Sequence, residues 1–184
     1  MSEPVPLGDK PHRAIKSYVL RQGRTTDAQR EALERDWPRF GLDWPRPMAA
    51  PAEWFGNARP VVVEIGFGNG EAVAAAAAAD PLRNYLGIEV HRPGVGRLLR
   101  DLSAREIGNV RVISADAVEV LRDGLTPASL DEVRLYFPDP WHKKRHHKRR
   151  LVQAELIARL AQRLRPGGYI HCATDWEPYA QQML

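Results

Sequence analysis

One junction constrains the fold of this chain more than any other: a continuous apolar run that ends in three alternate glycines. Residues Val61–Ile65 have the sequence VVVEI, and such β-branched runs are typical of strands buried on both faces of a parallel sheet. Gly66, Gly68 and Gly70 follow at once, and the alanine-rich segment Glu71–Ala79 favours a helix. The junction therefore predicts a strand, a tight turn and a helix in direct succession.

The same alternation continues to the end of the chain. Further strands are predicted at residues 84–90, 109–114, 130–137 and 169–173, and helices at 93–107, at 151–164 and from about Glu177. Strands that alternate with helices indicate an α/β fold with an open, mostly parallel sheet and helices on both faces. We place this domain at residues 61–184. The proline-rich residues 1–60 are expected to be irregular and partly flexible, with one helix at 27–37 capped by Thr26 or Asp27.

The glycine turn lies where open parallel sheets bind ligands, outside the carboxyl ends of the strands. Its Gly-x-Gly-x-Gly spacing differs from the Gly-x-Gly-x-x-Gly of dinucleotide binders. Glu89, at the end of the second strand, is placed to accept both hydroxyls of a ribose, which suits a nicotinamide cofactor or S-adenosylmethionine. Glu64 favours S-adenosylmethionine, because a carboxylate is unfavourable beside a pyrophosphate and suits an ammonium or sulfonium group.

Two more carboxylates follow strands on the same rim of the sheet. Asp116 comes after the third strand, where it can reach an adenine amino group or cap the helix that begins at Ala117, and both roles can hold together. Asp175 comes after the fifth strand. So many polar residues at strand ends on one rim indicate a single active site.

The segment at residues 135–150, LYFPDPWHKKRHHKRR, follows the fourth strand and joins a rigid carboxylate to dense positive charge. Pro138 and Pro140 fix the backbone around Asp139, which could orient a base or simply form a turn. Trp141 could stack on a base or pack under the loop. Six cations within eight residues repel one another unless a polyanion is near, which favours nucleic acid over a merely solvated face: Lys143, Lys144, Arg145, Lys148, Arg149 and Arg150.

Whole-chain properties agree with a nucleic-acid binder in a reducing compartment. The formal net charge is +4, and a second, sparser basic stretch at residues 12–24 is expected to be disordered until cofactor or RNA binds. The single cysteine, Cys172, excludes an internal disulfide and is expected to be a core residue. No secretory leader or membrane-spanning run occurs, so a cytoplasmic protein is expected. No metal site is expected at the three histidines of the basic run, because cations crowd them: His142, His146 and His147.

With these residues identified, the chain resembles the bacterial tRNA (guanine-N7)-methyltransferases, a family that uses S-adenosylmethionine. The similarity runs from about Ile15 to Leu184. It includes SYVLRQGR at 17–24, VEIGFGNG at 63–70, YLGIEVHRPGVG at 85–96, DAVEVL at 116–121, FPDPWHKKRHHKRR at 137–150 and ATDWEPYAQQML at 173–184. The glycine turn alone indicates only a methyltransferase, whereas FPDPWHKK together with TDWEPYA is specific to this family.

The resemblance implies a Rossmann-like class I methyltransferase that modifies N7 of a guanine in the variable loop of tRNA. It implies cofactor contacts by Glu64, Glu89, Asp116 and Asp139, with Asp139 also catalytic. It further implies substrate contacts by Lys143 and Asp175, and tRNA contacts by Arg145, His146, His147, Lys148, Arg149 and Arg150. The family continues past the point where this chain stops. The chain is therefore expected to lack the last strands of the sheet and a Thr-x-x-Glu element, and the sequence leaves its own activity open.

Two alternatives remain open on the residues alone. A nicotinamide-dependent oxidoreductase fits the glycine turn and Glu89, but the glycine spacing and the lack of a hydride-transfer acid or base at the strand ends count against it. A non-catalytic RNA-binding domain that keeps a vestigial cofactor fold fits the expected absence of the C-terminal element. The sequence does not distinguish a monomer from a homodimer.

Overall fold

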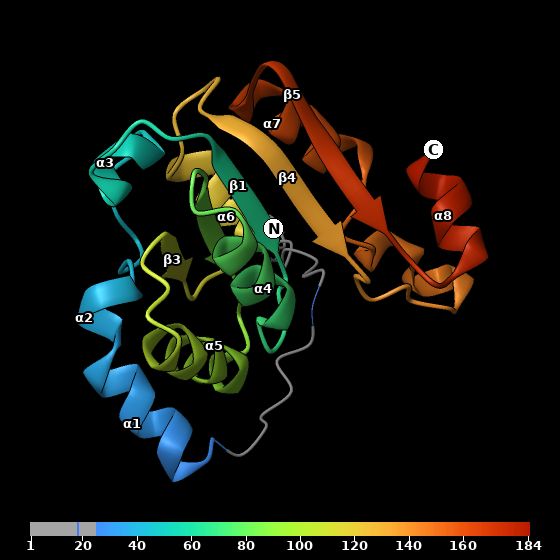
Figure 1. Cartoon of the computed structure of the whole chain (residues 1–184). Helices are drawn as coiled ribbons and strands as arrows, with labels where there is room; N and C mark the ends of the chain where they lie inside the picture. The colour runs from blue at the N-terminus through green and yellow to red at the C-terminus, as the bar shows by residue number, and fades with distance from the viewer. Residues whose placement is uncertain (1–17, 19–24) are drawn as a thin grey trace, which may run out of the picture.

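The computed structural model describes residue 18 and residues 25–184, and its centre is one five-stranded sheet (Figure 1). The strands are β1 (Val61–Ile65), β2 (Asn84–Ile88), β3 (Val110–Ile113), β4 (Leu130–Tyr136) and β5 (Leu164–Ala173). Their order in the sheet is β3-β2-β1-β4-β5, and every neighbouring pair is parallel. The strand order therefore reverses between β1 and β4, which is the point where open α/β sheets bind ligands.

Two layers of helices cover this sheet (Figure 1). One layer contains α4 (Glu71–Ala79) and α5 (Arg92–Ala104), and the other contains α6 (Ala117–Asp123) and α7 (Ala154–Arg163). Successive residues of β1 point to opposite layers, because Val62 belongs to the core under α4 and α5 while Val63 belongs to the core under α6 and α7. Burial on both faces explains why this strand is apolar at almost every position.

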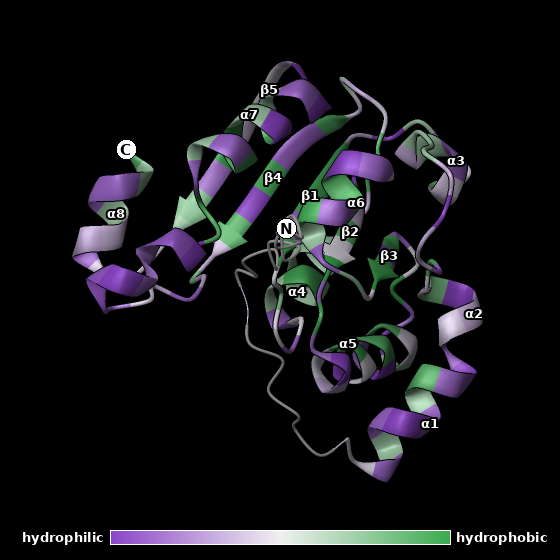
Figure 2. Ribbon diagram, turned by 180° about the vertical axis from the view of Figure 1, so that it is seen from behind, coloured by the Kyte–Doolittle hydropathy of each residue, from purple (hydrophilic) through white to green (hydrophobic). Residues whose placement is uncertain are grey.

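In the hydropathy colouring β1 and β3 are mainly hydrophobic, whereas β4 and β5 contain hydrophilic stretches (Figure 2). All residues of β1 and β2 are buried, whereas every residue of β5 is exposed or only half-buried. Cys172, on β5, is half-buried against the core under α6 and α7, and this burial raises the pKa of its thiol. Within the described part of the chain, no helix is long and apolar enough to cross a membrane.

All five predicted strands are present, but several ends differ from the prediction. β4 stops at Tyr136, because Phe137 takes a left-handed φ of 47°. β5 begins at Leu164, five residues before the predicted start, and the β4–β5 register shifts beside its Pro-Gly-Gly sequence. The helix predicted at 151–164 begins only at Ala154. The residues just before Ala154 contact α8 (Glu177–Met183) instead. The Val152 amide, for example, donates to the Tyr179 hydroxyl at 2.9 Å.

Residues 25–60 differ from the irregular segment that was predicted. The expected helix is present as α1 (Asp27–Arg35), and Thr26 and Gln29 cap it reciprocally. Two short helices were not predicted, α2 (Trp37–Phe40) and α3 (Pro51–Phe55). These elements pack into the same two cores as the rest of the chain, since Phe40 is buried in one and Trp54 in the other. The basic stretch at 12–24 lies outside the described residues, Tyr18 excepted.

Candidate cofactor site and nucleic-acid interface

A cavity of about 660 Å³ lies outside the carboxyl ends of β1, β2 and β4. It occupies the position where the strand order reverses. Five residues predicted for the site line it together: Gly66, Gly68, Glu89, Asp116 and Asp139. Its size is within the range of small-molecule sites in proteins.

The glycine turn presents bare backbone to this cavity. Gly66 and Gly68 have positive φ values of 72° and 59°, a conformation that glycine adopts without strain. A Cβ atom on either would meet nothing within 4 Å, so a ligand can approach the main chain closely here. Gly70 differs: it is buried, and a Cβ there would lie 2.7 Å from Leu98. Its place is therefore between α4 and α5 rather than on the cavity wall.

Glu89 fastens the glycine turn to the end of β2. One carboxylate oxygen accepts a hydrogen bond from the amide of Gly68 at 2.8 Å. The other accepts from the amides of Val90 and His91 at 2.7 and 2.9 Å. A carboxylate offers about four acceptor sites, so this arrangement leaves room for one ribose hydroxyl rather than the two that the sequence suggested.

The two aspartates of the cavity differ in how they are held. Asp116 caps α6, because one of its oxygens accepts from the Val118 amide at 3.0 Å. Asp139 is exposed and makes no hydrogen bond or ion pair among the described residues. Its loop is bracketed by Phe137 and Trp141, whose φ values of 47° and 48° are strained for bulky residues. The loop thus holds a carboxylate at the cavity rim without neutralising it.

Glu64 does not line the cavity, although Ile65, the next residue of β1, does. Only 5% of the residue is exposed. Burial raises the pKa of its carboxyl from 4.5 to about 7, against the opposing effect of the Arg134 guanidinium. Near neutral pH this group is therefore balanced between its two protonation states. A cation bound nearby would favour the carboxylate form.

This shifted pKa predicts an unusual pH dependence of stability. An acid with a raised pKa in the folded state binds its proton more tightly there than in the unfolded chain, so stability falls as pH rises from 4.5 to about 7. We expect Glu64 to contribute a decrease of about 3 kcal/mol in the free energy of unfolding across that window. The Glu64→Gln variant should lack this decrease. Urea unfolding of both proteins at pH 5 and pH 8 measures it, and an equal pH dependence in the two would contradict the expectation.

The basic run forms a loop beside α8 (Figure 1), and part of it is the 3-10 helix η1 (Lys144–Arg149). Trp141 packs within this loop, with the Arg149 guanidinium 4.1 Å from its ring centre. The three histidines face different partners, since His146 contacts Trp141, His142 contacts Trp176 and His147 contacts Arg150. Nowhere in the described residues do three or more potential metal-binding side chains gather.

One member of the predicted tRNA-binding set differs from the others in exposure. Lys143, Lys144, Arg145 and Lys148 are exposed and Arg149 is half-buried. Arg150, however, is 3% exposed and its guanidinium points into the protein. Lys143 and Asp175, predicted to bind the substrate, are exposed on the loops after β4 and β5 and do not line the cavity.

Comparison with known proteins identifies the family. A family model described as Methyltransf_4, putative methyltransferase, matches residues 58–184. A tRNA (guanine-N(7)-)-methyltransferase from Acidovorax sp. (strain JS42) is 56% identical over 172 residues, which cover 94% of this chain and 68% of that protein. One from Alkalilimnicola ehrlichii is 55% identical over 175 residues, covering 94% and 73%. The chain belongs to the tRNA (guanine-N(7)-)-methyltransferase family.

Solved structures of other methyltransferases share the fold of this chain. A precorrin-6y methyltransferase from Geobacter metallireducens has a TM-score of 0.54 at 16% identity, covering 87% of this chain and 72% of that one. An aminoglycoside resistance methyltransferase has a TM-score of 0.54 at 19% identity, covering 72% and 64%. At such low identity these similarities support the Rossmann-like methyltransferase fold alone. The family assignment leaves no place for the nicotinamide-dependent oxidoreductase.

Several residues that line the cavity at the strand ends were missed by sequence reasoning. They are His91 from the turn after β2, Arg92 from the start of α5, Tyr136 from the end of β4, and Phe137 just after it. Their position in the sequence could have identified them, because each follows or ends a strand on the ligand-binding rim.

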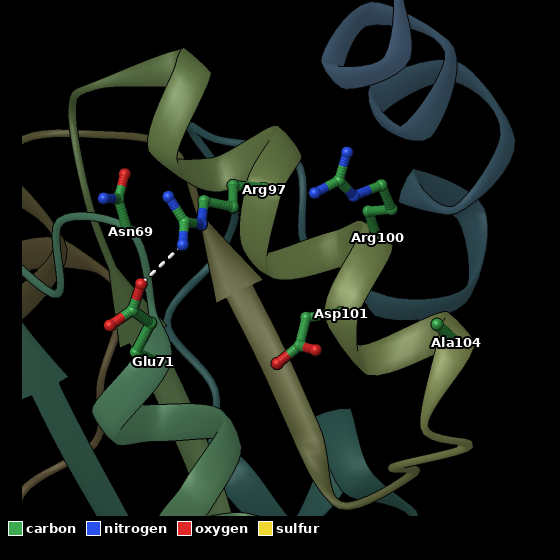
Figure 3. A pocket seen from close by; sticks show the side chains of 6 residues that line it. All are labelled: Asn69, Glu71, Arg97, Arg100, Asp101 and Ala104. Atoms are coloured by element: carbon green, nitrogen blue, oxygen red, sulfur yellow. Dashed lines mark hydrogen bonds and ion pairs between the residues drawn. The ribbon is translucent and has the colours of Figure 1, made fainter.

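A second cavity of about 300 Å³ lies between α4 and α5 (Figure 3). Glu71 and Arg97 on its wall form an ion pair with each other at 2.6 Å.

Proposed function

We propose that this chain transfers a methyl group from S-adenosylmethionine to N7 of a guanine in tRNA, and that this guanine lies in the variable loop. The observation that carries the proposal is the similarity to tRNA (guanine-N(7)-)-methyltransferases. It extends over 94% of the chain and therefore includes both the cavity and the basic loop. We further propose a cytoplasmic location, in keeping with the free thiol of Cys172.

The chemistry of the cavity suits this cofactor. Gly66 and Gly68 allow close approach to the backbone, and Glu89 retains an acceptor for a ribose hydroxyl. The second oxygen of Asp116 is free among the described residues to accept from an adenine amino group. Glu64 supplies a buried carboxyl whose charged form a nearby cationic group would favour. When bound, S-adenosylmethionine supplies a methyl group made electrophilic by its sulfonium.

The basic loop suits the nucleic acid. Four exposed cations and the half-buried Arg149 follow Asp139 within ten residues. Contacts from lysine and arginine to phosphates hold a nucleic acid in register but do not read its sequence. The loop would thus hold the tRNA backbone beside the cavity, while Asp139 at the rim meets the target base.

The test is methyl transfer from S-adenosylmethionine labelled in its methyl group to unmodified tRNA, followed by digestion and identification of the labelled nucleoside. We expect the label in 7-methylguanosine, and none in a matched tRNA whose variable-loop guanine is replaced by adenine. Label in another nucleoside would refute the proposed target atom. Cofactor and tRNA binding without any label would favour the non-catalytic RNA-binding alternative.

A further inference from the structure

Arg150 is the one residue of the basic run that is buried, and its guanidinium is surrounded by protein acceptors. Its Nε donates to the carbonyl oxygen of Pro140 at 2.8 Å. Its Nη1 donates to Oε1 of Gln182 at 2.7 Å, and its Nη2 lies 3.1 Å from Nε2 of His147. The guanidinium also lies 4.7 Å from the ring centre of Tyr179. These partners come from three places: the turn beside Asp139, η1 and α8.

The same two side chains of α8 hold the loop at a second point. Tyr179 accepts a hydrogen bond from the Val152 amide at 2.9 Å, and Gln182 donates to the Val152 carbonyl at 2.7 Å. Near the start of the loop, the ring of His142 packs edge-on against Trp176 at 4.4 Å. The loop is therefore attached to α8 and the turn before it at three places, and Arg150 is the contact that reaches the residue next to Asp139.

We propose that Arg150 is a positioning residue that locks the Asp139 loop onto α8, and that it does not contact tRNA. This inference rests on the proposed function, because it assigns Arg150 a part in placing Asp139 for methyl transfer. An arginine suits the task, since its planar fork of five donors can reach three acceptors at fixed angles and a lysine ammonium cannot. In the contact to His147 the guanidinium is the donor, because arginine has no acceptor.

The geometry argues against a phosphate contact by Arg150. Each of its three nitrogens already has a protein partner, and only 3% of the residue is exposed. Because the residue is so little exposed, the guanidinium would have to turn outward to bind a phosphate. It would then leave Pro140 and Gln182, which would release the turn that carries Asp139. Arg145, five residues earlier in the same run, is exposed, and among the described residues it is bonded only to its neighbour His146.

The test compares Arg150→Met with Arg145→Met, which remove the same charge from the same run. Two quantities are measured: the single-turnover rate of methyl transfer at saturating tRNA and cofactor, and the slope of log tRNA affinity against log salt. Arg150→Met should lower the saturated rate about tenfold to a hundredfold, because misplacing a catalytic group by about 1 Å can cost that much. It should leave the salt slope unchanged. Arg145→Met should instead reduce the slope by about one.

The opposite pattern would overturn the proposal: a salt slope reduced by about one in Arg150→Met, with the saturated rate retained. Gln182→Ala supplies a milder test, because it keeps the Arg150 charge and removes one of its acceptors together with the bond from Gln182 to Val152. It should lower the saturated rate in the same direction, and the double variant should be little slower than Arg150→Met. If the rate losses of the two single variants multiplied in the double variant, Arg150 and Gln182 would act independently, which would contradict the proposal. If the wild-type chain transfers no methyl group, the proposed function fails, and the salt slopes alone still decide whether Arg150 contacts RNA.

Discussion

Replacing Asp139 by asparagine should lower the saturated rate of methyl transfer by about a hundredfold to a thousandfold, while tRNA affinity stays nearly unchanged. Asparagine keeps the size of the side chain and its fit between Pro138 and Pro140, so the loop should retain its conformation. The negative charge is lost. The rate should fall because that charge acts on the transition state rather than on binding of the tRNA backbone.

The chemistry of the target atom explains why charge, and not proton transfer, is the expected contribution of Asp139. N7 of guanine carries a lone pair and no proton, so its attack on a methyl group needs no general base. Positive charge reaches the purine ring as the new bond forms, and a fixed carboxylate at the cavity rim offsets it. Asp139 is exposed and unpaired among the described residues, which leaves its charge available.

Single-turnover rates and tRNA dissociation constants, measured for the wild type and Asp139→Asn, check this expectation. Glu119→Gln is a matched control, because it removes an exposed carboxylate that belongs to α6 and does not line the cavity. The control should keep the wild-type rate. A large loss of tRNA binding in Asp139→Asn would contradict an electrostatic role in the transition state.

The parts of this fold that the sequence predicted are those specified by local signals. The β1–glycine–α4 junction follows from a β-branched run, the conformational freedom of glycine and the helix propensity of alanine. The cap of α6 is similarly local, because Asp116 precedes the amide it accepts from by only two residues. Placement of the strand-end residues on one rim follows from the rule that parallel strands end on the same side.

The parts that escaped prediction depend on residues distant in the chain. The short helices α2 and α3 exist because Phe40 and Trp54 find buried positions in the cores, and their four- and five-residue sequences give little signal alone. The inward direction of Arg150 depends on Gln182, which is 32 residues away. In the sequence, Arg150 is one cation among six, and nothing local marks it as buried.

The salt dependence of tRNA binding follows from which of these cations reach solvent. Six cations were counted in the sequence, but the burial of Arg150 leaves Lys143, Lys144, Arg145, Lys148 and Arg149. If all five contact phosphates, tRNA affinity should fall about one hundredfold to five hundredfold when monovalent salt rises from about 50 to 200 mM. The physical reason is the release of condensed counterions, which bulk salt makes less favourable.

Filter binding of tRNA at several salt concentrations gives this slope, and single substitutions then apportion it. Replacing Lys144 or Lys148 by glutamine should each reduce the slope by about 0.9 and weaken binding by a similar factor for different tRNAs. Arg59→Gln is the control, since Arg59 precedes β1 at the opposite end of the strands and bonds the Pro81 carbonyl. A slope near zero in the wild type would refute the assignment of this loop to the tRNA backbone, because an uncharged contact surface would show no counterion release.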